Sequence, residues 1–166
     1  MHYAVMKGHL NALYLLICID VDTRIKDEEG RTALHYAYEE GHLEIVKGLV
    51  VFGGVNERDN EGNTPLHHAA IKGKIDVVEY LVRHGGTVKG KEEDGATLLQ
   101  YAAQEGQLEV VRYLVEERRM NVNEPDNYGN TPADYATVSE SLEVVDYLVK
   151  HGEEKHEWGD GRGCGY

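Results

Sequence analysis

Apolar residues recur at helical spacing in two short segments between residues 64 and 86, and polar residues or glycines bound these segments. Thr64 predicts the N-cap of a first helix, because its side chain can pair with a free backbone N–H of the first turn. Gly73 predicts the end of that helix, because glycine adopts a left-handed C-cap without strain. A second helix is predicted to end at Gly85 and Gly86. The apolar faces of the two helices consist of Leu66, Ala69 and Ala70, and of Ile75, Val77, Val78, Leu81 and Val82.

This pattern repeats along the chain with a period of about 33 residues. Thr32, Thr64, Thr97 and Thr131 each open a matching stretch, at spacings of 32, 33 and 34 residues. A fixed period of this length indicates a stack of similar structural units. Such a stack offers a long binding surface, because each unit adds its own exposed residues to a shared face.

The four stretches read TALHYAYEEGHLEIVKGLV, TPLHHAAIKGKIDVVEYLV, TLLQYAAQEGQLEVVRYLV and TPADYATVSESLEVVDYLV. Their order of turn, short helix, tight reversal and second helix closely resembles the ankyrin repeat, and the resemblance covers nearly the whole chain. It implies an all-α solenoid of helix–turn–helix units with short β-hairpin or turn connections. We divide the chain into unit 1 (1–26, incomplete), unit 2 (27–58), unit 3 (59–91), unit 4 (92–125), unit 5 (126–158, a C-terminal cap) and a flexible tail, 159–166.

Three units depart from the repeated pattern. Unit 1 has no turn or N-cap, so it is either an internal start within a longer array or a blunt edge. Its second helical segment is almost wholly apolar, which predicts self-association through this edge or an upstream repeat. Unit 4 has one extra residue and predicts a longer second helix. Unit 5 has Glu140 in place of the interhelix glycine and Asp134 in place of the motif histidine, as expected of a polar capping unit.

The sequence predicts no catalytic residues, no metal site and no cofactor. The family resemblance implies that His35 and His67 are structural, and Gln100 and Asp134 at the equivalent places support this reading. Histidines and acidic residues near the C-terminus lack the ligand spacing of a zinc site. No serine has a nearby histidine and aspartate that would activate it. Cys18 lies in an apolar run and is predicted to be a small buried hydrophobe.

The net charge is −13 at pH 7. The negative charge is concentrated in three units, with three basic and seven acidic residues in unit 2, three and eight in unit 4, and two and eight in unit 5. An acidic surface disfavours direct binding to nucleic acid and favours a basic protein partner, although it can also serve only solubility. No apolar run has the roughly 20 residues of a membrane helix, so we expect no membrane insertion. Without a signal peptide or disulfide framework, the expected compartment is intracellular, the cytoplasm first and the nucleus as an alternative.

The resemblance implies partner contacts at the residues before each N-cap and near the end of each first helix. Aromatic residues on the first helices add to this set, because that helix lines the groove in the family; packing between neighbouring first helices is the alternative for them. The candidate partner-binding residues are Glu28, Glu29, Arg31, Tyr36, Glu39, Glu40, Asn60, Glu61, Asn63, His68, Ile71, Lys72, Glu93, Asp94, Tyr101, Gln104, Glu105 and Tyr128.

Our leading hypothesis is a protein-binding module that holds a partner with a basic segment at its concave face and hairpin tips. The first alternative is a regulatory or targeting fragment of a larger enzyme or channel, which the incomplete unit 1 favours. The second alternative is an enzyme in its own right, for which the sequence offers no set of site residues.

Overall fold

A computed structural model describes residues 1–52, 54–88, 90 and 94–156 of the chain. This part of the protein is helical and contains no strand, so the predicted all-α fold is confirmed and the connections between units are turns. Each unit contributes two antiparallel helices. They are α1 (His2–Met6) and α2 (Leu10–Cys18), α3 (Ala33–Glu40) and α4 (Leu43–Val50), α5 (Pro65–Ile71) and α6 (Ile75–Arg83), α7 (Leu98–Gln104) and α8 (Leu108–Glu116), and α9 (Pro132–Val138) and α10 (Leu142–His156).

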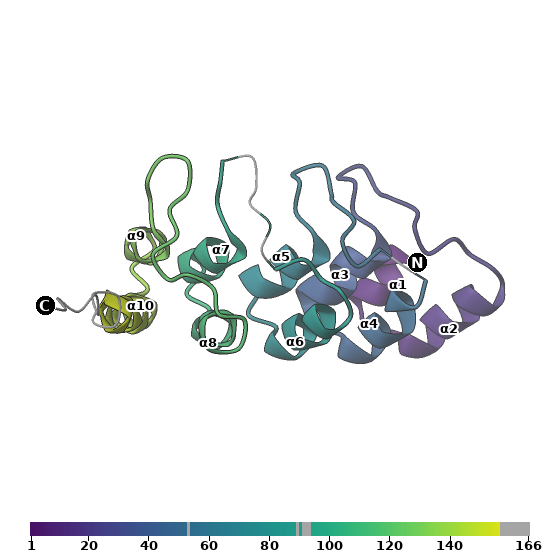
Figure 1. Ribbon diagram of the computed structural model, residues 1–166. Coiled ribbons are helices and arrows are strands. Elements are labelled where there is room, and N and C mark those ends of the chain that lie inside the picture. Colours follow the sequence, from purple (N-terminus) through teal and green to yellow (C-terminus); the bar gives the residue numbers. More distant parts are fainter. Residues whose placement is uncertain (53, 89, 91–93, 157–166) are drawn as a thin grey trace, which may run out of the picture.

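The units stack side by side in two rows of helices. Figure 1 shows the first helices α1, α3, α5, α7 and α9 in one row, the second helices in the other, and the connections between units projecting beyond the first-helix row. Neighbouring first helices pack closely because their contact positions carry small buried residues such as Ala69, Ala70, Ala102 and Ala103. Buried aliphatic residues of the second helices, such as Val78 and Leu81, complete one continuous core.

Each first helix after unit 1 begins with the predicted threonine cap. In unit 2 the backbone N–H of Thr32 donates to His35 Nδ1 at 3.1 Å, and the Thr32 hydroxyl lies 2.9 Å from the same nitrogen. In unit 4 the Thr97 N–H donates to Gln100 Oε1 at 2.7 Å. The residue three positions after the threonine therefore closes a capping box whether it is a histidine or a glutamine.

Residues of one unit also tie it to the next. His2 Nε2 lies 3.2 Å from the carbonyl of Arg31, and Gln100 Nε2 donates to the carbonyl of Asn130 at 2.8 Å. Each bond joins the residue at the motif-histidine position of one unit to the chain that enters the first helix of the next unit. The structural role expected of the motif histidine thus extends to both residue types.

The interhelix glycines are required for two reasons. Gly73 has a φ of +67°, which other residues adopt only with strain. A Cβ atom at this position would also lie 2.1 Å from Gln107 Oε1 of the next unit. Unit 5 departs from this rule as the sequence indicates, because Glu140 occupies the same left-handed conformation with a φ of +58°.

Two expectations from the sequence are wrong. The extra residue of unit 4 does not lengthen its second helix: α8 has nine residues, as α6 does, and the insertion is absorbed after it, where Arg119 turns with a φ of +55°. Cys18 is exposed, because it lies at the end of α2 on a side that the described residues leave uncovered.

Candidate functional site

An aspartate organises the turn at the start of units 2, 3 and 5. Asp59 Oδ1 accepts hydrogen bonds from the backbone N–H groups of Glu61 at 3.0 Å and Asn63 at 2.9 Å. Asp27 and Asp126 make the same pair of bonds in units 2 and 5. Aspartate suits this place because its short side chain can bond to the backbone two to four residues ahead.

The second carboxylate oxygen of each of these aspartates bonds to the aromatic residue at the fourth position of the first helix, which we name the groove residue. The Tyr36 hydroxyl donates to Asp27 Oδ2 at 2.7 Å, and the Tyr135 hydroxyl donates to Asp126 Oδ2 at 2.9 Å. In unit 3 His68 takes the tyrosine's place, with Nε2 2.7 Å from Asp59 Oδ2. These aromatic residues therefore fasten the projecting turns to the first helices, in addition to any contact with a partner.

These bonds perturb the ionisation of both partners. Burial raises the pKa of Asp126, but hydrogen bonds from Asn130, Tyr135 and Tyr128 outweigh it and lower the pKa to about 2. The pKa of Asp27 is lowered in the same way. Burial and the bond to Asp27 raise the pKa of Tyr36 to about 12. The aspartates are therefore ionised acceptors at neutral pH, and the tyrosine remains a donor.

Several of the predicted contact residues are bonded within the protein. Arg31 pairs with Glu29, lies 3.7 Å from Glu39, and packs over the Tyr36 ring with its guanidinium carbon 4.5 Å from the ring centre. Lys72 of the next unit lies 3.4 Å from the same Glu39 carboxylate. The two basic residues thus neutralise part of the acidic surface between units 2 and 3.

Asn60 also has a structural role. Its backbone N–H donates to the carbonyl of Glu29 at 3.0 Å, and its side-chain amide donates to the carbonyl of Glu28 at 2.9 Å. The projecting turns of units 2 and 3 are therefore held against each other. Asn127 repeats the backbone bond in unit 5, where its N–H donates to the carbonyl of Asp94 at 2.9 Å.

A cavity of about 370 Å³ lies where the turns of units 2 and 3 meet the first helix α5; we name it the acidic cavity. Four of its lining residues are carboxylates, and its guanidinium is already paired with Glu29. The lining therefore carries an excess of negative charge. It consists of Glu28, Glu29, Arg31, Asp59, Asn60, Glu61 and His68.

A second cavity of about 240 Å³ lies between the first helices of units 4 and 5. It brings together Gln104, which the sequence predicts as a contact residue, and the nearby Tyr135 and Val138. Val138 is 86% exposed, so this part of the surface is apolar as well as polar.

The predicted partner-binding residues differ in how much of their surface is exposed to solvent. Glu93 lies outside the described residues. Exposed side chains can meet a partner directly, whereas half-buried ones present only part of their surface. The exposed ones are Glu28, Glu29, Glu40, Asn60, Glu61, Lys72, Gln104, Glu105 and Tyr128, and the half-buried ones are Arg31, Tyr36, Glu39, Asn63, His68, Ile71, Asp94 and Tyr101.

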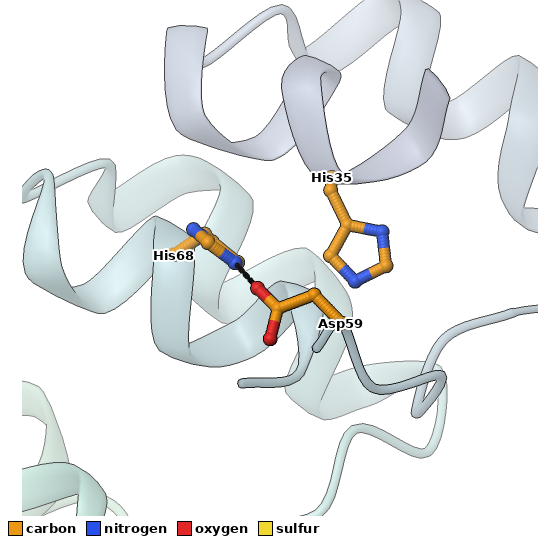
Figure 2. Close-up of side chains that lie close together, drawn as sticks. All are labelled: His35, Asp59 and His68. Carbon is orange, nitrogen blue, oxygen red and sulfur yellow. Dashed lines mark hydrogen bonds and ion pairs between the residues drawn. The ribbon is translucent and has the colours of Figure 1, made fainter. Parts of the chain in front are cut away.

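One cluster joins three residues that the sequence analysis treated separately. Figure 2 shows His35 of α3, Asp59 of the following turn and His68 of α5 converging between units 2 and 3. The His35 side chain is buried, and its ring meets the His68 ring edge-on with centres 5.5 Å apart. Burial, and to a lesser extent the neighbouring His68, lower the pKa of His35 to about 4. His35 is therefore neutral at physiological pH.

Sequence reasoning missed the role of Asp59 in this cluster, because it read the residue only as part of a turn. A signal was present in the repeat itself. The capping residue of one unit contacts the groove residue of the next, as His2 does with Tyr36 and His67 with Tyr101, with ring centres 5.8 and 5.9 Å apart. Histidine at both places, as at residues 35 and 68, therefore predicts two neighbouring imidazoles.

The comparison with known families matches the description "Ankyrin repeats (3 copies)" to residues 1–92 and 85–157. A curated relative from Oryza sativa subsp. japonica, named "Probable E3 ubiquitin-protein ligase XBOS33", is 38% identical over 52 residues. That match covers 31% of this chain and 10% of the rice protein. Within the described part of the chain, no helix is long and apolar enough to cross a membrane.

Proposed function

We propose that this chain, which belongs to the ankyrin-repeat family, holds a basic segment of a partner protein at its acidic cavity and the neighbouring turns. Ankyrin repeats are generally protein–protein interaction modules and are typically not catalytic. Beyond that general role, the acidic cavity favours a basic class of partner and defines where on the surface it binds.

The composition of the acidic cavity carries this proposal. Glu28 and Glu61 are exposed carboxylates on the turns of successive units, and Asp59 lines the same cavity with its side chain bonded to His68 of the first helix. Lysine and arginine side chains of a partner would gain from this negative potential, and within the described part of the chain they would not have to break an ion pair of Glu28 first. Electrostatic attraction of this kind raises the rate of encounter and fixes the register of the complex.

The turns also suit a binding role because they are fixed in place before a partner arrives. Asn60 donates hydrogen bonds to the carbonyls of Glu28 and Glu29, and Asp59 accepts hydrogen bonds from the backbone of its own turn. These bonds hold the exposed carboxylates at defined positions. A surface that is already ordered loses less conformational entropy on binding.

A charge-neutralisation experiment tests the proposal. The probe is a short arginine- and lysine-rich peptide, with an acidic peptide of equal length as the negative control, and binding is measured by fluorescence anisotropy. We expect Glu28→Gln with Glu61→Gln to weaken binding about two- to thirty-fold, the range for two exposed charge contacts. Binding should also weaken as salt rises from about 0.05 to 0.5 M, because salt screens exposed charges.

The matched control variant is Asp76→Asn with Glu109→Gln, which removes the same charge from exposed positions on α6 and α8. This control should bind the basic peptide nearly as well as the wild type. Equal weakening by both double variants would mean that only net charge matters. Affinity that is independent of salt would contradict the proposed acidic site.

The alternative of a targeting segment within a larger enzyme has one supporting observation. The rice relative carries its similarity to this chain within 10% of its length, and its name is that of an enzyme. An immunoblot of the source tissue with an antibody against residues 94–152 distinguishes the cases. A band well above the 18.6 kDa of this chain would favour the larger protein.

A further inference from the structure

We propose that His35, Asp59 and His68 form a binding site for Zn²⁺ or a similar first-row transition-metal ion between units 2 and 3. Two imidazoles and one carboxylate are a ligand set that zinc accepts readily. The inference is independent of the proposed partner binding, because it concerns the isolated chain and a metal ion.

The first observation is a buried nitrogen without a well-formed hydrogen bond. His35 is only 1% exposed, and within the described part of the chain its Nε2 atom makes no hydrogen bond of good geometry, although the backbone of Glu57 is near enough to interact weakly with the ring. The equivalent atoms of His2 and Gln100 contact a carbonyl of the next unit. A buried polar atom left unpaired costs about 1–3 kcal/mol, so a ligand that satisfies it gains affinity.

The second observation is the geometry of the cluster. One candidate ligand atom from each of the three residues lies within 4.8 Å of the other two. Around a tetrahedral zinc with bonds of about 2.0–2.1 Å, ligand atoms lie about 3.3 Å apart. Side-chain movements on the order of 1 Å would therefore close the site, and His68 Nε2 and Asp59 Oδ2 are already 2.7 Å apart.

The surrounding residues can orient these ligands. Asp59 Oδ1 is held by the turn, which leaves Oδ2 facing the two histidines (Figure 2). When His35 Nε2 binds a metal, its Nδ1 carries the proton and can donate to the Thr32 hydroxyl 2.9 Å away. This arrangement costs the bond that the Thr32 N–H now makes to Nδ1, and that cost lowers the affinity.

The acidic cavity lies next to the cluster and shares Asp59 and His68 with it. Its carboxylates favour a cation electrostatically, and its open side leaves room for water as a further ligand. Three protein ligands with an open position are the arrangement of a zinc site that can exchange its fourth ligand.

The repeat supplies variants that remove one ligand and keep the fold. Tyrosine occupies the place of His68 in the first helices of units 2, 4 and 5, and Tyr36 and Tyr135 bond to the turn aspartate there. His68→Tyr should therefore preserve unit 3. Glutamine occupies the place of His35 in unit 4, so His35→Gln should preserve unit 2.

The experiment is isothermal titration of the full chain with Zn²⁺, with Co²⁺ absorption as a report on coordination. We expect one site that His68→Tyr and His35→Gln each weaken by more than the roughly 10–100-fold that losing an outer-shell partner costs. The control is His67→Gln, which changes a capping histidine that lies outside the cluster. It should bind zinc as the wild type does.

Nitrogen NMR of the histidine rings provides the second readout. Zinc should shift the Nε2 resonances of His35 and His68, whereas binding at the histidine and acidic residues near the C-terminus would leave both unchanged. No binding, binding with unshifted rings, or equal affinity in the wild type and His68→Tyr would each overturn the proposed site. Circular dichroism of each variant confirms that the fold is retained.

Discussion

At the interhelix position, which is residue 140 in unit 5, both the backbone conformation and the packing of the next unit restrict the choice of amino acid. Four earlier units have glycine there, at residues 8, 41, 73 and 106, and each glycine has a positive φ. Each also lies against a side chain of the next unit, as Gly41 does against Lys74. Glu140 keeps the left-handed backbone, but in the described residues no further unit packs against it. The steric reason for glycine is therefore absent, and only the conformational reason remains.

We predict that Glu140→Gly stabilises the protein by about 1 kcal/mol. A non-glycine residue in the left-handed region costs roughly 1–2 kcal/mol, and the greater freedom of glycine in the unfolded chain offsets part of the gain. Urea unfolding followed by circular dichroism measures the difference.

Glu140→Ala is the control for this prediction, because it removes the charge but keeps the Cβ atom and its strain. It should be no more stable than the wild type. If Glu140→Ala and Glu140→Gly gained equally, the effect would come from the acidic charge and the conformational explanation would be wrong.

Local patterns predicted the residues whose role depends on their neighbours in sequence. Thr32 and Gly73 have the predicted conformations, because caps are decided within one turn of helix. The cluster of His35, Asp59 and His68 could not be predicted this way, because His35 is 24 and 33 positions from the other two and meets them only when units 2 and 3 stack. Cys18 was misjudged for a related reason: an apolar run does not reveal which side of its helix a neighbour covers.

At the scale of the element, the turns of units 2 and 5 each depend on one ionised carboxylate, Asp27 and Asp126. Asp126 accepts backbone bonds from Tyr128 and Asn130 and side-chain bonds from Asn130 and Tyr135. The helix and turn order of this unit was predictable from sequence. The bond from Tyr135 to Asp126 was not, because the groove tyrosines could equally have been partner contacts or packing residues.

We predict that the stabilisation from Asp126 disappears in acid. Its pKa in the folded protein is about 2, below the ordinary value of 3.8 that applies in the unfolded chain. The unfolded state therefore binds the proton first, and the contribution is complete above about pH 4 and is lost as the pH falls toward 2. Asp126→Asn should be less stable than the wild type at pH 6, and the difference should shrink at pH 3.

Urea unfolding of both proteins at the two pH values measures this effect. Asp146→Asn on the exposed side of α10 controls for the change in net charge. A stability difference between the wild type and Asp126→Asn that stays constant from pH 6 to pH 3 would show that the turn does not depend on the ionised carboxylate.

At the scale of the whole molecule, the stack is unevenly covered. Stability in a repeat protein comes largely from contacts between neighbouring units. Unit 1 buries Val5 and Leu13, while Leu15 of α2 and Ile19, directly after α2, are 69% and 71% exposed. Units 3 and 4 bury both of their helices between neighbours. The sequence indicated this exposed surface through the almost wholly apolar second segment of unit 1.

We predict that this uncovered face makes unit 1 the least protected part of the stack and promotes self-association. Amide hydrogens of residues 1–26 should exchange faster than those of units 3 and 4, because local opening breaks contacts with only one neighbouring unit.

Sedimentation velocity at increasing concentration should show association, because exposed apolar side chains gain when they are buried against each other. Leu15→Lys should reduce the association, because the charge would have to be buried in the contact. Leu142→Lys at the other end, where the leucine is 77% exposed, is the matched control and should leave association unchanged. Slow exchange throughout unit 1 in a sample that stays monomeric would contradict both expectations, and would mean that the contacts of Val5 and Leu13 are enough to hold the first unit closed.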